Sequence, residues 1–290
     1  MTWNIHGGQR EGRGCHATIP CKLNQTNKYL PHILDEIHRH EGLDVIALQE
    51  VYRAQARILA QTLAITRGFY EKPYFVETRS CNGAQGAADN DFGIAIISRY
   101  PFIDVERVKL DGPLFAGVEK RMLARVIIQV GGSRVHVYNT HLAPNDFLRI
   151  GEVGRLRAQV FKDRNSPRDF AFRPVLMGDF NAQPGSWTYR EIRRDLFLDA
   201  WREVHNKECT VFSRGSENGC TYDTFSPEAR IDYILPGSGG VFRVDFAQVT
   251  SNQSLFDIFD LSKDGRKPNP TLDCNKVPDH LPVVAHLSYR

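Results

Sequence analysis

Hydrophobic residues along the chain follow two different spacings, which predict a mixture of strands and helices. Short, nearly continuous apolar runs recur through the sequence, and such runs are typical of strands covered on both faces. Longer stretches repeat their apolar positions with the period of a helix turn, as expected for helices with one buried face. The predicted strands cover residues 2–6, 43–50, 73–77, 92–98, 102–108, 122–130, 134–140, 174–181, 210–213, 230–235, 241–249 and 282–288. The predicted helices cover residues 27–40, 53–66, 147–162 and 185–194.

This order of elements predicts an α/β fold. Gly131-Gly132 joins the runs 122–130 and 134–140, and a two-glycine link between strands is a strong hairpin signal. No fixed-period repeat, low-complexity tract or linker divides the sequence. The chain has 290 residues, of which 41% are apolar, so its core can hold two packed sheets with helices outside. We expect residues 1–290 to form a single catalytic domain.

The charge balance indicates no particular partner. Lysine and arginine number 37 against 34 aspartates and glutamates, which gives a net charge of +3. A protein that coats nucleic acid usually has a stronger basic excess, whereas an enzyme that binds a phosphate-bearing substrate only transiently does not need one. No apolar run is long enough to cross a membrane, and no signal peptide is present in this chain.

Six cysteines occur without a C-x-x-C pair, so they indicate neither a zinc site nor a redox motif. Cys15 and Cys21 are close in sequence, as are Cys209 and Cys220, and both pairs lie in glycine-rich stretches. We interpret them as disulfides of surface loops, which predicts a secreted or otherwise extracytoplasmic protein. The alternative is a set of ordinary thiols in a cytosolic enzyme. The remaining cysteines are Cys81 and Cys274.

Polar side chains recur where the apolar strands end. Each one alone has an ordinary explanation, because Asp and Asn start turns and a single histidine is often a structural donor. Asp232 is different, since a carboxylate inside an apolar strand costs free energy unless it has a partner, and a histidine is the natural one. The polar residues at strand ends are Asn4, Glu50, Thr140, His141, Asp179, Asn181, Asp232, Asp279 and His280.

Together these residue types suit one chemistry. Carboxylates combined with an amide oxygen are ligands for a hard divalent cation such as magnesium. Two histidines and an Asp–His pair supply proton transfer and positive charge. The sequence has no serine-nucleophile motif, no glycine-rich phosphate loop with lysine and no Cys/His cluster. Metal-assisted hydrolysis of a phosphoester by an activated water therefore fits the inventory.

Seven motifs stand in order along the chain: TWNIHGG, DVIALQEV, GIAIISRYP, YNTHLAP, LMGDFNAQP, RIDYIL and PDHLPVVAHL. They resemble the sequential motifs of the endonuclease/exonuclease/phosphatase superfamily. Its members include pancreatic-type deoxyribonucleases, abasic-site endonucleases, neutral sphingomyelinases and inositol-polyphosphate 5-phosphatases. The resemblance spans Asn4 to His286. It implies a four-layer α/β sandwich, in which two packed mixed or antiparallel β-sheets are flanked by helices and the site lies at their shared edge.

The resemblance also implies roles for the residues at the strand ends. Glu50 would be the principal ligand of a Mg²⁺ or Mn²⁺ ion. Asn4 and Asp279 would belong to the surrounding metal and phosphate shell. Asp179 would orient or deprotonate the attacking water, and Asn181 would hold water or a phosphoryl oxygen.

Both histidines are implied to contact the phosphate. His280 would pair with Asp232, which fixes its tautomer, and would donate to the phosphate or act as the base. His141 would stabilise the transition state or the leaving oxygen. Which histidine serves as the general acid stays open at this point. Glu77 is a further candidate, as a carboxylate partner of His141 in deoxyribonuclease-like members.

One departure from the family pattern is Pro278, because a serine commonly precedes the late Asp-His. The change removes a hydroxyl group but no catalytic group, so we expect an active enzyme. The inositol phosphatase pattern is absent, since Met177 rather than tryptophan precedes Gly178. The abasic-site pattern is absent as well, since His6 stands where those enzymes have an acid.

We therefore expect a divalent-metal-dependent phosphodiesterase, in the first place a nuclease. A lipid phosphodiesterase of the sphingomyelinase type is the alternative, and a catalytically inactive binding or toxin-associated module with the same fold is the second alternative. The expected partner is a phosphodiester substrate, either nucleic acid or a phospholipid head group, and the expected state is a monomer.

Basic residues near the motif loops could contact a nucleic-acid backbone. They could equally belong to an ordinary surface of mixed charge. These residues are Arg10, Arg13, Lys120, Arg121, Arg125, Arg155 and Arg157.

Overall fold

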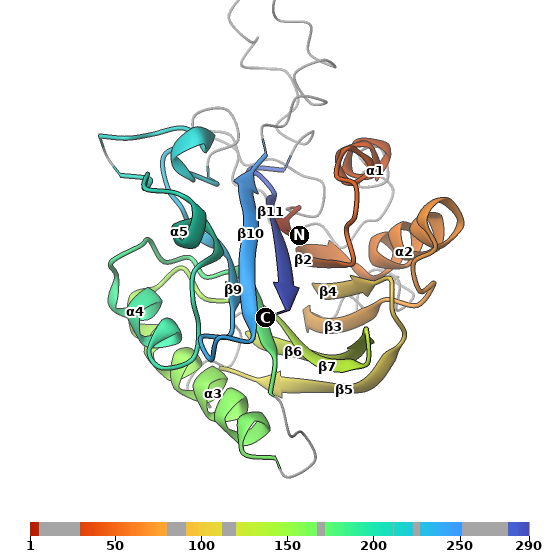
Figure 1. Ribbon diagram of the computed structural model, residues 1–290, viewed down its shortest axis with the longest axis horizontal. Coiled ribbons are helices and arrows are strands. Elements are labelled where there is room, and N and C mark those ends of the chain that lie inside the picture. The colour runs from red at the N-terminus through yellow and green to blue at the C-terminus, as the bar shows by residue number, and fades with distance from the viewer. Residues whose placement is uncertain are drawn as a thin grey trace, which may run out of the picture.

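The architecture consists of two β-sheets packed face to face, with helices on their outer sides (Figure 1). The computed structural model describes residues 1–5, 30–79, 91–111, 120–166, 172–210, 212–222, 227–250 and 278–289. Apolar side chains from both sheets meet in the middle, among them Ile94, Ile96, Val126, Val137 and Met177. This is the expected four-layer α/β sandwich.

The first sheet has six strands in the order β10-β11-β1-β2-β4-β3. Its central strand β1 runs parallel to β2 and antiparallel to β11, and the other pairs are antiparallel. The short N-terminal strand β1 therefore lies between β2 and the C-terminal strand β11 in the same sheet. The bounds are Thr2–Asn4 (β1), Val45–Tyr52 (β2), Tyr74–Arg79 (β3), Phe92–Ser98 (β4), Phe242–Val249 (β10) and Val283–Tyr289 (β11).

The second sheet has five strands in the order β5-β6-β7-β8-β9, and only β7 and β8 are parallel. The predicted hairpin is present between β6 and β7. Its turn residues Gly131 and Gly132 have φ angles of +52° and +84°, which suit glycine and the twist of a tight hairpin. The bounds are Phe102–Lys109 (β5), Met122–Val130 (β6), Ser133–His141 (β7), Pro174–Asp179 (β8) and Asp232–Pro236 (β9).

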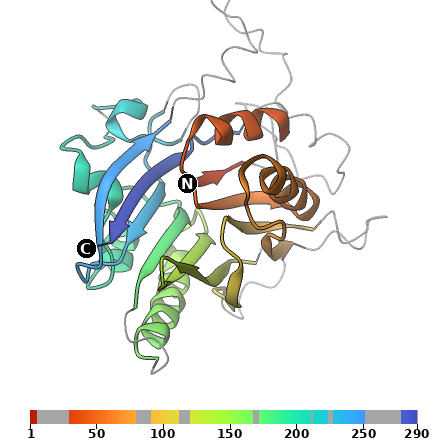
Figure 2. The same cartoon turned by 45° about the vertical axis from the view of Figure 1, so that its right-hand side comes forward.

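Helices cover the outer face of each sheet. Figures 1 and 2 show α1 and α2 on one side of the strands and α3 on the other. Ile33, Ile37 and Leu59 pack against the first sheet, and Val153 and Leu156 pack against the second. The bounds are Leu30–Arg39 (α1), Arg53–Arg67 (α2), Asp146–Arg164 (α3), Trp187–Arg193 (α4), Ala200–Val204 (α5) and Ser216–Asn218 (η4, a 3₁₀ turn). None of the helices in the described ranges is long and apolar enough to cross a membrane.

Besides small shifts in element ends, one predicted strand does not form among the described residues and one short helix was not predicted. The strand expected at residues 210–213 is wrong, because Thr210 and Ser213 instead hydrogen-bond to each other across a tight turn. Phe212 in that turn is almost fully exposed and buries no apolar surface that would hold a strand in a sheet. The short helix α5 had no counterpart among the predicted elements.

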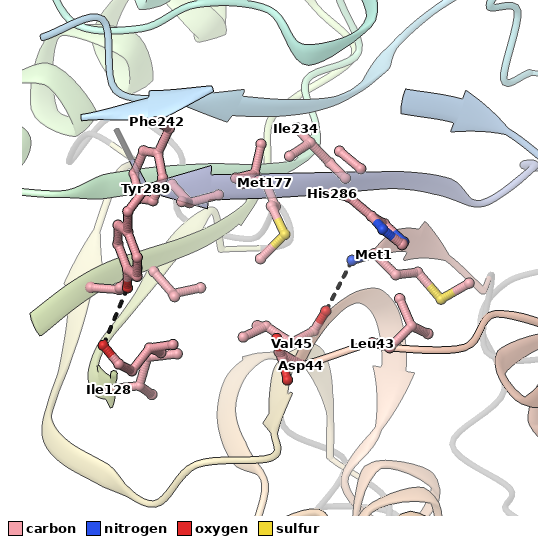
Figure 3. A pocket seen from close by; sticks show the side chains of 17 residues that line it. Met1, Leu43, Asp44, Val45, Ile128, Met177, Ile234, Phe242, His286 and Tyr289 are labelled. Atoms are coloured by element: carbon pink, nitrogen blue, oxygen red, sulfur yellow. Dashed lines mark hydrogen bonds between the residues drawn. The ribbon is translucent and has the colours of Figure 1, made fainter. Parts of the chain in front are cut away.

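A cleft of about 280 Å³ opens between the sheets at the end of the sandwich where β2, β7 and β8 begin (Figure 3). Its walls are largely apolar and include Val45, Val135 and Val175. Tyr289 lies at this end too, and its hydroxyl donates to the carbonyl of Val130 at 3.5 Å. The polar residues predicted at strand ends lie at the other end of the same strands.

Candidate active site

The strand order brings the predicted polar residues to one edge of the sandwich. In the second sheet, Asp179 lies opposite His141 of β7 on one side and opposite Asp232 of β9 on the other. In the first sheet, Asn4 at the end of β1 lies opposite Gln49, next to Glu50. Residues far apart in sequence therefore meet because they occupy neighbouring strand ends.

Asn4 connects the two sheets. Its Nδ2 donates to Oδ2 of Asp179 at 3.0 Å and to Oε1 of Glu50 at 3.1 Å. Asn4 and Asp179 are both 1% exposed, whereas the Glu50 side chain is 16% exposed. The amide thus holds two carboxylates from different sheets at a fixed distance, and Glu50 is the one that faces solvent.

The backbone takes unusual conformations at this edge. Glu50 has a φ angle of +53° at a point where the β2–β4 register shifts, and Asn181 has a φ angle of +49°. Non-glycine residues rarely adopt these angles, which cost free energy and cluster at functional sites. Gly178 is required for a different reason, because a Cβ there would lie 2.1 Å from the carbonyl oxygen of Thr140.

Asp179 and Asn181 form a compact group with His141. Oδ1 of Asp179 accepts from the backbone N–H of Asn181 at 2.8 Å. Nδ2 of Asn181 donates to the carbonyl of Leu142 at 2.9 Å and lies 3.1 Å from Nε2 of His141. The same imidazole nitrogen lies 3.5 Å from Asp179 and 3.9 Å from Glu50. His141 therefore faces the centre of the site.

His280 and Asp232 form the expected pair. Nδ1 of His280 lies 2.8 Å from Oδ2 of Asp232, and both side chains are buried. Its other ring nitrogen, Nε2, lies 3.7 Å from Asp179 and 3.9 Å from Asp279. Trp3 donates its indole N–H to the backbone carbonyl of His280 at 2.9 Å. The imidazole is thus fixed on one side and directed into the site on the other.

The surroundings of His280 and Asp179 raise the pKa values of both side chains. Burial lowers the pKa of His280, but the carboxylates of Asp232, Asp179 and Asp279 outweigh it and hold that pKa well above its usual range. Burial raises the pKa of Asp179, and the neighbouring charge of Asp232 raises it further, to about 7. His280 is therefore a cation at neutral pH, and Asp179 exchanges its proton near neutrality.

The donor set also fits a divalent cation. Asp179, Asp232 and His280 offer atoms that all lie within 4.8 Å of one another. Oδ1 of Asp232 is buried and has no hydrogen-bond partner among the described residues. Since Asp232 already binds His280 through its other oxygen, the oxygen-rich group around Glu50 and Asn4 suits a hard cation better. A metal at this edge agrees with the chemistry of the side chains.

Other predicted residues lie outside this group. Glu77 pairs with Gly93 in the sheet, and its role as a partner of His141 stays a prediction. Arg125 is buried and binds Asp104 and Asp163, which is a structural role. Arg155 and Arg157 likewise bind backbone carbonyls through their guanidinium groups. Arg121 is buried and Lys120 is exposed, while Arg10, Arg13, Cys15, Cys21, Cys81 and Cys274 lie outside the described residues.

Several residues that the sequence did not single out support the site. Nε2 of Gln49 donates to Oδ1 of Asn139 at 2.7 Å, and the amide of Asn139 donates to carbonyls of β2 and β4, so this buried pair joins the sheets. The ring of Tyr222 packs edge-on against His280 with centroids 5.1 Å apart. For Gln49 and Asn139 the sequence signal was their position beside the motif residues Glu50 and Thr140, whereas Tyr222 stands outside the motifs.

The fold is that of the α/β-sandwich phosphoesterases. The chain belongs to the endonuclease/exonuclease/phosphatase family, whose sequence profile matches residues 1–254. A comparison with curated proteins gave no match.

Solved structures of this fold match nearly the whole chain. A mannosyl-6-phosphatase from Bacteroides thetaiotaomicron is 15% identical, with 99% of this chain and 98% of that chain covered and a TM-score of 0.67. An endonuclease/exonuclease/phosphatase from Beutenbergia cavernae is 25% identical, with coverage of 99% and 70% and a TM-score of 0.62. TDP2 from D. rerio, solved with a single-strand DNA product, is 17% identical, with coverage of 99% and 97% and a TM-score of 0.59.

Proposed function

We propose that this protein is a divalent-metal-dependent phosphodiester hydrolase that acts on nucleic acid. The observation that carries the proposal is the convergence of Asp179, His141 and His280. Nε2 of each histidine lies within 3.7 Å of the same carboxylate oxygen, Oδ2 of Asp179. In this arrangement the carboxylate can accept a proton from the attacking water while the two imidazoles stabilise the phosphoryl oxygens.

The residues of the site divide the work of hydrolysis. Asp179 takes a proton from the attacking water; its pKa, about 7 in the metal-free protein, allows this at neutral pH, and a nearby cation would lower it. The new bond forms between this water oxygen and phosphorus, and the bond from phosphorus to the leaving oxygen breaks. His280 carries the positive charge that stabilises the phosphoryl oxygens, and Asp232 maintains its orientation. The leaving oxygen takes up a proton from an imidazole.

Glu50, with Asn4 and Asp279, would hold a Mg²⁺ or Mn²⁺ ion, which supplies Lewis-acid stabilisation of the phosphoryl charge. Asn181 helps to place the substrate, since its amide contacts His141 and Leu142 and lies at the same edge. The family likeness to TDP2, whose structure holds a DNA product, supports a nucleic-acid substrate.

Two further properties are part of the proposal. Residues 1–290 would act as one catalytic domain and as a monomer. The disulfide between Cys209 and Cys220 agrees with the sequence-based expectation and with a secreted or extracytoplasmic protein, because such bonds persist in oxidising compartments.

The test compares substrates under identical conditions. We expect nicking of supercoiled plasmid DNA and hydrolysis of bis(p-nitrophenyl) phosphate with Mg²⁺, loss of both with EDTA, and a decrease of about 10²–10⁴-fold for His280→Ala. Release of phosphocholine from sphingomyelin without plasmid nicking would favour the lipid phosphodiesterase. No turnover of diesters, or of p-nitrophenyl phosphate as the monoester, would indicate an inactive module.

A further inference from the structure

A short segment, Cys220–Tyr222, contacts both members of the His280–Asp232 pair. It lies between the start of β9, which carries Asp232, and the residues before β11, which carry His280. The segment belongs to neither sheet, although isolated bridges link Tyr222 to Ala229 and to His280. It is therefore placed to set the distance between the two side chains.

Thr221 makes the central contacts of this segment. Its Oγ1 accepts from the backbone N–H of Ile231 at 3.2 Å and from that of Asp232 at 3.3 Å. Its carbonyl accepts from the N–H of Leu281 at 2.7 Å, directly after His280. Thr221 is fully buried, so no solvent can replace these bonds if they are lost. One residue thus fixes the backbone of both partners.

The neighbour on each side of Thr221 has a role as well. Tyr222 places its ring edge-on against the imidazole of His280. Cys220 is buried and forms the disulfide with Cys209, which closes a loop over a sequence separation of 11 residues. The position of Thr221 is therefore limited by a covalent bond on one side and by ring packing on the other.

The other end of the disulfide loop contacts the same part of the chain. Glu208, next to Cys209, accepts from Nε of Arg230 at 2.8 Å. Arg230 is buried and also donates to Asp199 at 2.9 Å. Both ends of the loop therefore hold the residues that lead into Asp232, through Glu208 on one side and Thr221 on the other.

We propose that Thr221 is a positioning residue for the His280–Asp232 pair and that the Cys209–Cys220 disulfide keeps Thr221 in place, so full turnover depends on this disulfide. The inference rests on the proposed phosphodiester hydrolysis. Its basis is geometric, because a small displacement of a catalytic group lowers the rate of reaction strongly, whereas substrate binding by the remaining residues is preserved.

The first test compares Thr221→Val with Thr221→Ser, using bis(p-nitrophenyl) phosphate and Mg²⁺. Valine keeps the shape but removes the hydroxyl oxygen, and serine keeps the oxygen. We expect kcat to fall by at least about 10-fold and at most about 10²-fold in Thr221→Val, with KM nearly unchanged, and to recover to within about 3-fold in Thr221→Ser. Unchanged kcat in a folded Thr221→Val protein would overturn the proposal.

Thr250→Val is the matched control. Thr250 is also buried, and its hydroxyl donates to Glu36 of α1 at 2.9 Å rather than bonding to the His280–Asp232 pair or the backbone beside it. We expect the urea midpoint of this variant to fall about as much as that of Thr221→Val, whereas its kcat stays at the wild-type value. An equal loss of kcat in both variants would mean that the effect is general destabilisation and would contradict the positioning role.

The second test removes the disulfide with Cys209→Ser and Cys220→Ser together. We expect a folded protein whose kcat falls by about 10-fold, and whose combination with Thr221→Val is no slower than Thr221→Val alone, because both changes act through the same contact. Multiplicative losses, or wild-type kcat without the disulfide, would refute the shared role.

A substrate-free measurement separates this inference from the proposed function. The Nδ1–H proton of His280 should give a downfield NMR signal from its hydrogen bond to Asp232, and we expect this signal to shift or broaden in Thr221→Val and in the serine double variant, but not in Thr250→Val. If wild-type protein hydrolyses no phosphodiester, the proposed function fails while this signal still tests the positioning. An unaltered signal in both variants would overturn the inference.

Discussion

Replacing Asp179 by asparagine should stabilise the protein at alkaline pH while abolishing most of its activity. Asp179 is 1% exposed, and its pKa is raised from 3.8 to about 7. The folded protein therefore keeps a proton at pH values where the unfolded chain has already lost it. Since asparagine cannot ionise, Asp179→Asn removes the cost of ionising a buried carboxyl group.

The sign and size follow from linkage. For an acid whose folded pKa is raised, the ionisation cost is absent below the unfolded pKa of 3.8, grows between 3.8 and about 7, and is constant above that. At about 1.4 kcal/mol per pH unit the full cost is roughly 4 kcal/mol. Against this, the asparagine amide would face a donor, either Nδ2 of Asn4 or the N–H of Asn181, at a pH-independent cost of about 1–3 kcal/mol.

Urea unfolding of both proteins in EDTA at about pH 5 and about pH 8 measures the effect. The variant should lie within about 1.5 kcal/mol of wild type at the lower pH and be about 1–3 kcal/mol more stable at the higher pH. The hydrogen-bond cost cancels in the change between the two pH values, which should be about 3 kcal/mol. Turnover should fall by about 10²–10⁴-fold. A stability difference that does not change with pH would refute the reasoning.

Three further predictions concern other residues. His280→Ala and Asp232→Asn should each lower kcat by about 10²–10⁴-fold. The double variant should be no slower than the slower single variant, because the two residues act as a unit. Steady-state assays in which the two losses multiply would contradict this. Glu50→Gln should raise the Mg²⁺ concentration needed for half-maximal turnover by at least about 10-fold, as metal titrations would show; an unchanged midpoint would argue against its role as a ligand. Serine at Cys209 and Cys220 together should lower the free energy of unfolding by about 3 kcal/mol, as expected for a loop of this length, and identical urea midpoints would exclude that contribution.

The sequence predicted the main elements because their hydrophobic patterns were strong. Strands β4 and β6 have the predicted ends at residues 92–98 and 122–130, since nearly every position is buried. The failures have local causes. The helix Ala200–Val204 is too short to show a periodicity. The apolar pair Val211-Phe212 resembled part of a strand in the sequence, although the ring of Phe212 faces solvent.

The site was predictable as a set of residues but not as a geometry. Each strand end showed its polar side chain in the sequence, and Asp232 required a partner from its position alone. The bridging of Glu50 and Asp179 by Asn4 depends on which strands are neighbours and on how the sheets face each other. These are non-local properties, and a single sequence carries no direct signal for them. Thr221 was missed for the same reason, since its partners lie in other segments.

The charge balance of the site explains why these features occur together. Burial raises the pKa of Asp179 and the neighbouring charge of Asp232 raises it further, to about 7, although His280 lies only 3.7 Å from Asp179 and acts in the opposite direction. A divalent cation beside Glu50 would lower that pKa, because an opposite charge favours the ionised form. Metal binding and formation of the general base are then one linked equilibrium. The buried carboxylate that reduces stability in the metal-free protein is the group that the bound cation would convert into a base.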